Sequence, residues 1–152
     1  MKKTLGVLIN PLAGLGGRVG LKGSDGPEIV ERALALGGKP EASLRAEQAL
    51  SQLTDLDELP RICTYGGDMG ENQLAKLGFP AEVLGRPAEA RTTAQDTREA
   101  ARLLLEAGCD LILFAGGDGT ALDLCGVIGD RVPVVGIPAG VKIHSGVYAI
   151  NP

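Results

Sequence analysis

Aromatic and cysteine residues are scarce in this sequence. Aromatic residues make up 3% of its 152 residues, so the hydrophobic core has to be built from aliphatic side chains. The same scarcity removes most of the stacking surfaces on which single-stranded nucleic acids bind. The three cysteines are far apart, and none forms a C-x-x-C pair or a metal-ligand spacing with the single histidine. We therefore expect reduced, buried cysteines in a cytoplasmic protein rather than a disulfide framework or a zinc site.

A strong charge of one sign and a long hydrophobic run are also absent. The net charge is −4 and no block of Lys and Arg occurs, which argues against a surface for nucleic acid. No apolar segment approaches the roughly 20 residues that span a bilayer, and the N-terminal apolar run is broken at Asn10-Pro11. We therefore expect neither a nucleic-acid partner nor a membrane anchor. A small phosphorylated ligand is compatible with this charge, because backbone N–H groups bind phosphate without cationic side chains.

Glycine, in contrast, is abundant. The chain has 23 glycines, about twice the average usage, and they cluster in short loops instead of recurring at a fixed period. With 44% hydrophobic and 22% charged residues, the composition is that of a globular protein. A length of 152 residues predicts one domain with a substantial core.

Short apolar runs alternate with helical patterns along the chain. The apolar runs predict strands at 4–9, 61–65, 81–85, 110–115 and 132–138. Helices are predicted at 28–38, 41–53, within 66–78, at 93–108 and 121–128, with a further short helix starting near Lys142. The pattern at 93–108 is the strongest, because Thr93 and Asp96 form a capping-box start and Gly108 is a C-terminal stop. Near-continuous apolar strands that alternate with helices predict an α/β fold, with a parallel sheet covered by helices on both faces.

Four glycine-bearing turns follow predicted strands. They lie at 10–17, 66–70, 116–120 and 138–140. In a parallel sheet the carboxyl ends of the strands share one edge, and ligands bind outside that edge. A single glycine turn can reflect tight geometry alone, but four on one edge predict a cleft in which the backbone approaches a ligand closely.

The most informative turn is Gly116-Gly117-Asp118-Gly119-Thr120, which follows the apolar run 110–115. Glycines remove the Cβ atoms that would keep a phosphate away, and they allow positive φ angles. We expect the next helix to start near Thr120 and to direct its N–H groups at the cleft. Asp118 would repel an anion unless Mg²⁺ intervenes or the carboxylate takes a proton from an attacking hydroxyl. The alternative is that Asp118 is only a helix N-cap and that the glycines only turn the chain.

Two motifs carry a resemblance to known kinases. The turn at 116–120 resembles the Gly-Gly-Asp-Gly-Thr signature shared by NAD kinases, diacylglycerol kinases and sphingosine kinases, and in a variant form by phosphofructokinases. The loop at 10–17 resembles the Asn-Pro and glycine loop of the same kinases. The runs NPLAGLGGRVGLKGSDG and GIPAGVKIHSGVYAINP resemble more specifically the ATP-NAD kinase-like branch, which includes proteins associated with acetoin catabolism. The resemblance covers essentially the whole chain.

The resemblance implies a Rossmann-like domain, similar to the N-terminal domain of NAD kinases. Such a domain takes part in phosphoryl transfer from ATP or polyphosphate, with Mg²⁺, to a hydroxyl group. In NAD kinases this hydroxyl is the 2′-OH of the adenosine ribose, and the product is NADP. Asp118 would be the general base or would organise Mg²⁺. The residues that would bind phosphates or the nucleotide are Asn10, Gly14, Gly16, Gly17, Gly116, Gly117, Gly119, Thr120 and Gly140, the last on the far side of the cleft.

The chain also departs from the NAD kinase pattern. NAD kinases carry a second, β-rich domain with an Asn-Glu or Asn-Asp pair that holds the dinucleotide, and neither pair occurs here. We therefore expect residues 1–152 to be the N-terminal catalytic half of such a kinase, and a poor enzyme without the other half. Two alternatives stay open: a related kinase with another acceptor, such as a sugar phosphate, lipid or small diol, and a nucleotide-binding module that transfers nothing. The oligomeric state, a homo-oligomer included, stays open too.

Several other polar residues are candidates for the same cleft, each with a structural alternative. Asp68 would place a second acid across the cleft from Asp118, or would be a helix N-cap. Glu71 could cap its helix or repel an anion. The basic candidates could contact phosphate or be ordinary surface side chains, and they are Lys22, Lys142 and His144, with less support for Arg86 and Arg91.

Overall fold

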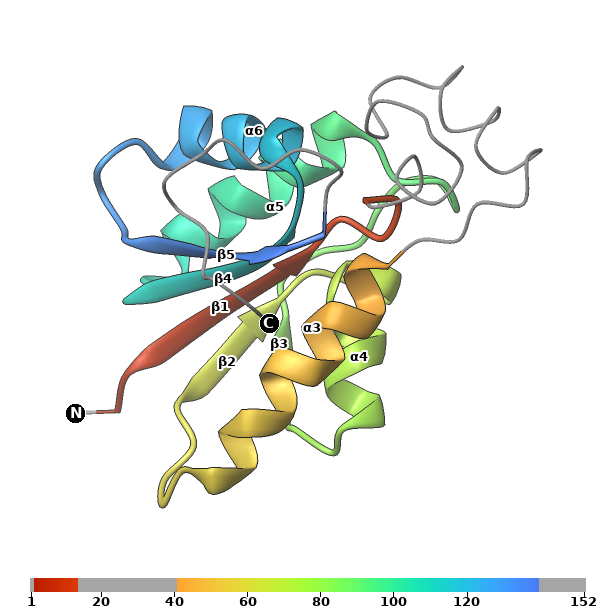
Figure 1. Cartoon of the computed structure of the whole chain (residues 1–152). Coiled ribbons are helices and arrows are strands. Elements are labelled where there is room, and N and C mark those ends of the chain that lie inside the picture. Colours follow the sequence, from red (N-terminus) through yellow and green to blue (C-terminus); the bar gives the residue numbers. More distant parts are fainter. Residues whose placement is uncertain (1, 14–40, 140–152) are drawn as a thin grey trace.

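The computed structural model describes residues 2–13 and 41–139. Within these residues, five strands form one sheet in which every neighbouring pair is parallel. The sheet has the order β3-β2-β1-β4-β5 (Figure 1). The strands are β1 (Thr4–Ile9), β2 (Arg61–Thr64), β3 (Glu82–Val83), β4 (Leu111–Gly116) and β5 (Val134–Pro138).

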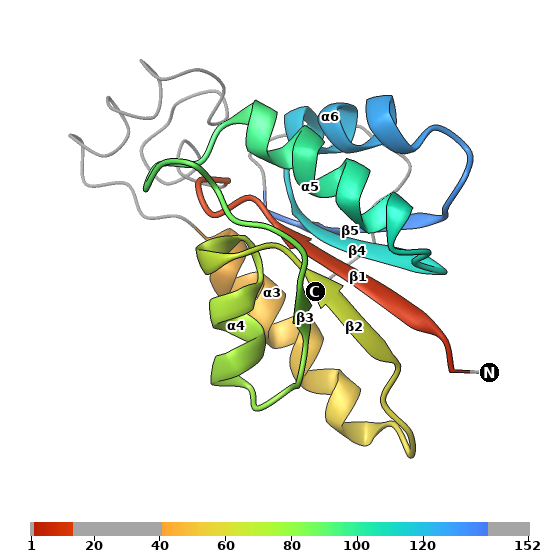
Figure 2. The same cartoon turned by 180° about the vertical axis from the view of Figure 1, so that it is seen from behind.

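Helices cover both faces of the sheet, as Figures 1 and 2 show from opposite sides. One face carries α3 and α4, and the other carries α5 and α6. The helical segments are α3 (Ala42–Leu50), η1 (Ser51–Asp55), η2 (Gly67–Met69), α4 (Glu71–Lys76), α5 (Ala94–Glu106) and α6 (Asp118–Ile128). The predicted α/β fold, a Rossmann-like parallel sheet with helices on both faces, is confirmed. Among the described helices, none has the length and apolar character that a bilayer span requires.

The central strand β1 is buried along its whole length. Its side chains alternate between the two layers of the core. Leu5, Val7 and Ile9 join the cluster that includes α3 and α4, whereas Leu8 joins the cluster that includes α5 and α6. This double burial explains why β1 is a continuous apolar run instead of an alternating pattern.

The chain changes direction across the sheet at β1. From β1 it proceeds to β2 and β3 on one side, and then crosses to β4 and β5 on the other side. In the register between β1 and β4, Ile9 is paired with Ala115, so these two strands end at the same level. The crevice where the strand order reverses is the place where open parallel sheets bind nucleotides.

Most predicted elements are present, with changed bounds. The capping box of α5 is confirmed: the Asp96 N–H donates to Thr93 Oγ1, and the Thr93 N–H donates to the Asp96 carboxylate at 2.8 Å. Gly108 has a φ of 78°, which suits its predicted role as the stop after this helix. The helices predicted at 28–38 and near Lys142 lie outside the described residues.

Two predicted boundaries are wrong. The strand predicted at 81–85 is reduced to Glu82–Val83, although the Gly85 carbonyl beyond it still accepts from the Gly66 N–H at 2.7 Å. The helix predicted at 121–128 begins three residues earlier, at Asp118. Glycine is a poor helix former, yet Gly119 lies in the first turn of α6. Burial of Ala121, Leu124 and Ile128 against the sheet outweighs that local preference.

Candidate functional site

The turn after β4 leads directly into α6. Gly117 is the N-cap residue, with a φ of −99° and a ψ of −168°, and Asp118 is the first helical residue. The first helical hydrogen bond runs from the Ala121 N–H to the Gly117 carbonyl at 3.0 Å. The amides of Gly119 and Thr120 precede that bond, as the first N–H groups of a helix do. This end of α6 therefore combines N–H donors with the positive end of a helix dipole, which suits an anion.

Gly116 is required for packing within the turn. A Cβ atom on this glycine would lie 2.6 Å from Thr120 Oγ1 and 2.7 Å from Thr120 Cβ, closer than real atoms approach. The missing side chain therefore makes room for Thr120, whose exposed fraction is 5%. The expectation that this glycine clears space for a phosphate is wrong for Gly116, because Thr120 fills that space.

The freedom of glycine to adopt positive φ angles is not used in this turn. None of Gly116, Gly117 and Gly119 has a positive φ angle. Any residue can adopt the extended backbone of Gly117. At Gly117 and Gly119, clearance for a ligand stays a prediction.

Asp118 lies in the first turn of α6 and is partly exposed. The alternative interpretation, that this carboxylate is only the N-cap, is wrong because Gly117 occupies the N-cap position. A carboxylate in the first helical turn interacts favourably with the helix dipole. Asp118 thus stands beside the amides that would bind an anion, at the crevice between β1 and β4.

Asn10 connects the end of β1 to the start of α6. Its Nδ2 donates to Thr120 Oγ1 at 2.9 Å, and its Oδ1 accepts from the Leu12 N–H at 3.1 Å. Its own N–H donates to the Ala115 carbonyl on β4, also at 2.9 Å. Sequence reasoning assigned Asn10 to the ligand and missed this contact with Thr120. No local signal indicated it, because the order of the strands that brings the two motifs together is not given by the sequence.

A second glycine turn, after β2, has a different construction. Gly67 has a φ of 63°, and its N–H donates to Glu71 Oε1 at 3.0 Å. Both oxygens of the Glu71 carboxylate accept from the Arg86 guanidinium, at 2.5 and 2.8 Å. These contacts, that with Arg86 first, hold the pKa of Glu71 below its usual range. The carboxylate of Glu71 thus occupies the position at which this turn would accept an anion.

Two further described candidates, Asp68 and Arg86, make their contacts in and around the turn after β2. Asp68 is exposed in the turn after β2, where it accepts from Asn72 Nδ2 at 2.8 Å, and β1 separates its strand from β4. Arg86 is engaged with Glu71, and its reach into the cleft stays a prediction. Arg91 is exposed in the segment between β3 and α5. No contact that the structure gives for Asp68 or Arg86 leads to the turn after β4.

The other predicted site residues lie outside the described residues: Gly14, Gly16, Gly17, Lys22, Gly140, Lys142 and His144. The residues that flank them lie at the same sheet edge. The Ala13 carbonyl accepts from the N–H groups of Glu41 and Ala42, at 3.2 and 3.4 Å, and the Ala139 N–H donates to the Gly116 carbonyl at 3.3 Å. Within residues 2–13 and 41–139, no group of three or more His, Cys, Asp or Glu side chains could hold a metal ion.

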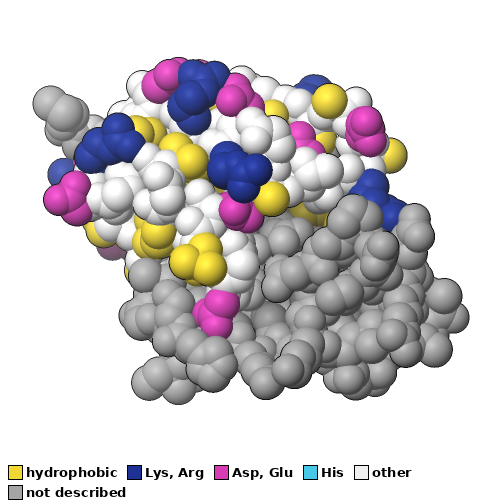
Figure 3. Space-filling model, turned by 90° about the horizontal axis from the view of Figure 1, so that it is seen from above, with side chains coloured by type: hydrophobic (Ala, Val, Ile, Leu, Met, Phe, Trp, Pro, Cys, Tyr) yellow, Lys and Arg dark blue, Asp and Glu magenta, His cyan; other side chains and the backbone are white. Residues whose placement is uncertain are grey.

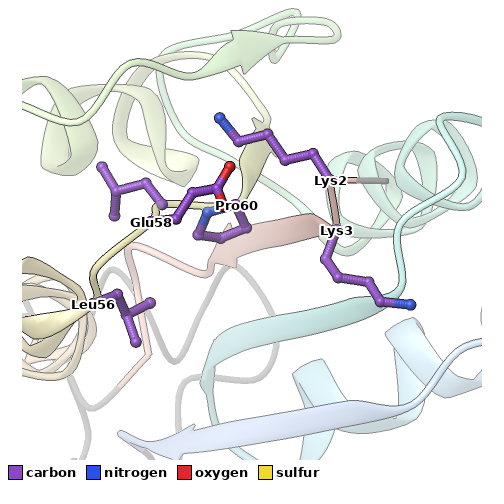
Figure 4. Close-up of a pocket in the computed structure, with 6 residues that line it drawn as sticks. Lys2, Lys3, Leu56, Glu58 and Pro60 are labelled. Atoms are coloured by element: carbon purple, nitrogen blue, oxygen red, sulfur yellow. The ribbon is translucent and has the colours of Figure 1, made fainter.

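A hollow of about 430 Å³ lies at the opposite edge of the sheet, where the strands begin (Figure 4). It is lined by Lys2, Lys3, Leu56, Glu58, Leu59 and Pro60. The side chains of Lys2 and Lys3 extend away from each other, so their ammonium groups do not converge on a single anion (Figure 4). This hollow is also remote from the carboxyl ends of the strands, where parallel sheets bind ligands.

The face covered by α5 and α6 carries charges of both signs (Figure 3). Arg98 on α5 pairs with Asp123 on α6 at 2.9 Å. Arg102 pairs with Glu99 and Glu106 on its own helix, at 2.5 and 2.6 Å. The described part of this face is therefore a mixed, ion-paired surface rather than a basic stripe.

Comparison with known proteins identifies the family. Residues 5–152 match the model of the ATP-NAD kinase N-terminal domain. The chain belongs to this family. The resemblance based on the glycine motifs is thereby confirmed, and the family description is that of a kinase domain. No curated protein shows significant sequence similarity to the chain.

One solved structure with similarity to the chain is UDP-GlcNAc 2-epimerase from Neisseria meningitidis bound to UDP-GlcNAc. The two share 13% sequence identity with a TM-score of 0.41. The similarity covers 89% of this chain and 32% of the epimerase chain, so the chain spans about a third of that protein's length. A similarity this low carries no information about ligand or activity.

Proposed function

We propose that the chain is the nucleotide-binding half of an ATP-dependent kinase whose acceptor is the 2′-OH of NAD, with NADP as the product. The observation that supports this most is the position of Asp118. It is a carboxylate in the first turn of α6, at the crevice between β1 and β4. Membership of the ATP-NAD kinase N-terminal domain family supports both the donor and the acceptor.

The proposed roles follow from the chemistry of the turn. The amides at the start of α6, those of Gly119 and Thr120, bind the phosphates of ATP as an anion at a helix N-terminus. The acceptor oxygen attacks the γ-phosphorus, and the bond from that phosphorus to the oxygen of the β-phosphate breaks. The proton of the acceptor hydroxyl passes to the Asp118 carboxylate. ADP leaves, and the phosphoryl group stays on the acceptor.

The residues of this turn fit a magnesium ion that arrives with ATP. Mg²⁺ keeps several waters and is held in such sites by one or two carboxylates together with substrate phosphates. Asp118 is a carboxylate of this kind, and no fuller cluster of ligands is present among the described residues. Bound there, the ion would neutralise part of the phosphate charge.

The test is a phosphoryl-transfer assay on the longest natural polypeptide that contains this sequence, because the family resemblance implies a β-rich domain that completes the dinucleotide site. ATP or polyphosphate is supplied with Mg²⁺ and NAD, and NADP is measured with an NADP-specific dehydrogenase. We expect NADP to form. Transfer only to a sugar phosphate, lipid or small diol would overturn the acceptor. ATP binding without transfer to any acceptor would indicate a nucleotide-binding module instead.

A second test uses Gly117→Val. The backbone angles of Gly117 suit any residue, so this variant should fold, while its branched side chain enters the space in front of the amides. We expect ATP affinity to fall by about tenfold or more, measured by calorimetry, since a tenfold loss corresponds to only about 1.4 kcal/mol. The far-ultraviolet circular dichroism spectrum is the control for folding. Unchanged affinity in the folded variant would remove the phosphate role of this turn.

A further inference from the structure

The contact between Asn10 and Thr120 joins the two strands on either side of the reversal point. Asn10 follows β1 directly, and Thr120 is the third residue of α6, 110 positions later in the chain. Asn10 Nδ2 donates to Thr120 Oγ1 at 2.9 Å. Such a contact links the loop after β1 to the helix that carries Asp118.

Both partners are held firmly on their own side. Asn10 is fastened to β4 through its N–H, and its carbonyl and Oδ1 accept from the N–H groups of Ala13 and Leu12. Thr120 is 5% exposed, and its side chain packs over the bare backbone of Gly116. Neither side chain can therefore turn away without breaking other contacts.

We infer that the hydrogen bond from Asn10 to Thr120 is a positioning contact, which holds the first turn of α6, and Asp118 within it, in the orientation that phosphoryl transfer requires. Asp118 lies between two fixed points, the Gly116 backbone and the Thr120 side chain. The inference rests on the proposed kinase function. In this inference Asn10 acts on the reaction through Thr120 instead of contacting the nucleotide directly.

The contact affects the rate of phosphoryl transfer because a reacting group has to be oriented within narrow limits. A displacement of about 1 Å at a distance from the chemistry can reduce a rate by about a hundredfold. Without the hydrogen bond, α6 would stay packed on the sheet through the buried residues further along the helix. Its N-terminal end would gain freedom to tilt.

The variant Thr120→Val removes the hydroxyl and preserves the shape of the side chain. In the full-length kinase we expect kcat to fall by about tenfold to a hundredfold, with a much smaller change in KM for ATP. Thr120→Ser, which keeps the hydroxyl, should restore most of kcat. The matched control is Thr64→Val. Thr64 is also buried, and its Oγ1 donates to the Val7 carbonyl at 2.8 Å. It lies on β2, the strand that precedes the other glycine turn. This control should lower stability and leave kcat unchanged.

A double-mutant cycle isolates the contact itself. Asn10→Ala and Thr120→Val are measured singly and together, and we expect the double variant to lose little more kcat than the worse single variant. If the two single-variant losses of kcat multiply in the double variant, the two residues act independently and the inference is overturned. An unchanged kcat in Thr120→Val would overturn it as well.

Amide hydrogen exchange separates this inference from the proposed function. We expect Thr120→Val, and not Thr64→Val, to accelerate exchange at the Ala121 N–H, which makes the first helical hydrogen bond of α6. If the wild-type protein transfers no phosphoryl group, the proposed function fails and exchange alone decides whether the contact holds the helix start. Equal exchange in wild type and Thr120→Val would refute the positioning role whatever the activity.

Discussion

The two Gly-Gly-Asp turns of this domain share a sequence pattern and differ in what their backbone amides face. In the turn after β2, the Gly67 N–H is bound by the chain's own carboxylate, Glu71, which is paired in turn with Arg86. In the turn after β4, the N-cap residue is Gly117, which has no side chain to accept from the amides that follow. The Gly67 amide is thus satisfied within the domain, while the helices that follow the two turns, α4 and α6, both begin at a glycine N-cap without a side-chain cap.

The difference follows from backbone geometry. Gly67 and Gly70 have positive φ angles of 63° and 146°, which close the first turn into the short segment η2 before α4. Gly117 keeps an extended backbone, so the second turn enters a helix of 11 residues at once. The same three residue types therefore produce a turn closed by the chain's own carboxylate at one place and the immediate start of an 11-residue helix at the other. A Gly-Gly-Asp pattern alone does not distinguish the two outcomes.

The strongest way to test this comparison is to exchange the aspartate of each turn for asparagine. We expect Asp118→Asn to reduce phosphoryl transfer by about 10²–10⁴-fold, because an amide cannot accept the proton of the acceptor hydroxyl. The matched variant Asp68→Asn should retain the wild-type rate, since Asp68 is exposed in the internally satisfied turn and contacts Asn72. Initial rates of NADP formation in the full-length protein measure both. A comparable loss in Asp68→Asn would mean that both turns serve the reaction.

Local signals in the sequence were sufficient for much of the fold. The capping residues Thr93 and Asp96 define the start of α5, and apolar runs define the buried strands. The edge on which ligands bind could be predicted too, because parallel strands necessarily end together. These inferences need only neighbouring residues or a general rule of topology.

Contacts between distant residues could not be predicted in the same way. The pairing of Asn10 with Thr120 spans 110 positions, and that of Glu71 with Arg86 spans 15. Glycine is the clearest case, because it can be required for several reasons that look identical in a sequence. Gly116 makes room for a side chain, Gly67 adopts a positive φ angle with nothing near it, and Gly70 does both, since a Cβ there would collide with Thr64.

A smaller effect, on stability, should distinguish Gly67 from Gly117, the second glycines of the two turns. We expect Gly67→Ala to lower the free energy of unfolding by about 1–2 kcal/mol, because an L residue is strained in the left-handed region. Gly117→Ala should cost only about 0.5 kcal/mol, from the loss of a favourable N-cap residue. Urea unfolding at pH 7 measures both. Gly67→Asn is the control, since asparagine tolerates this region better than alanine and should recover part of the loss. Equal losses at the two positions would contradict the geometric distinction.

The smallest effect concerns the carboxylate that closes the turn after β2. Because the pKa of Glu71 is lowered in the folded protein, its ionised form favours folding. This contribution is complete above the ordinary glutamate pKa of about 4.3 and disappears as the pH falls through the lower folded value. Glu71→Gln removes it at every pH, so the urea midpoints of variant and wild type should differ at pH 7 and converge as the pH falls below the folded pKa of Glu71.

Arg86→Met tests the cause of that shift. It removes the partner that lowers the Glu71 pKa most, so it should flatten the acid dependence nearly as much as Glu71→Gln does. Both effects should be small, because Arg86 is largely exposed and such pairs are screened by water and salt. A wild-type curve parallel to both variants would mean that Glu71 does not close its turn in solution, and the contrast between the two turns would then rest on their backbone angles alone.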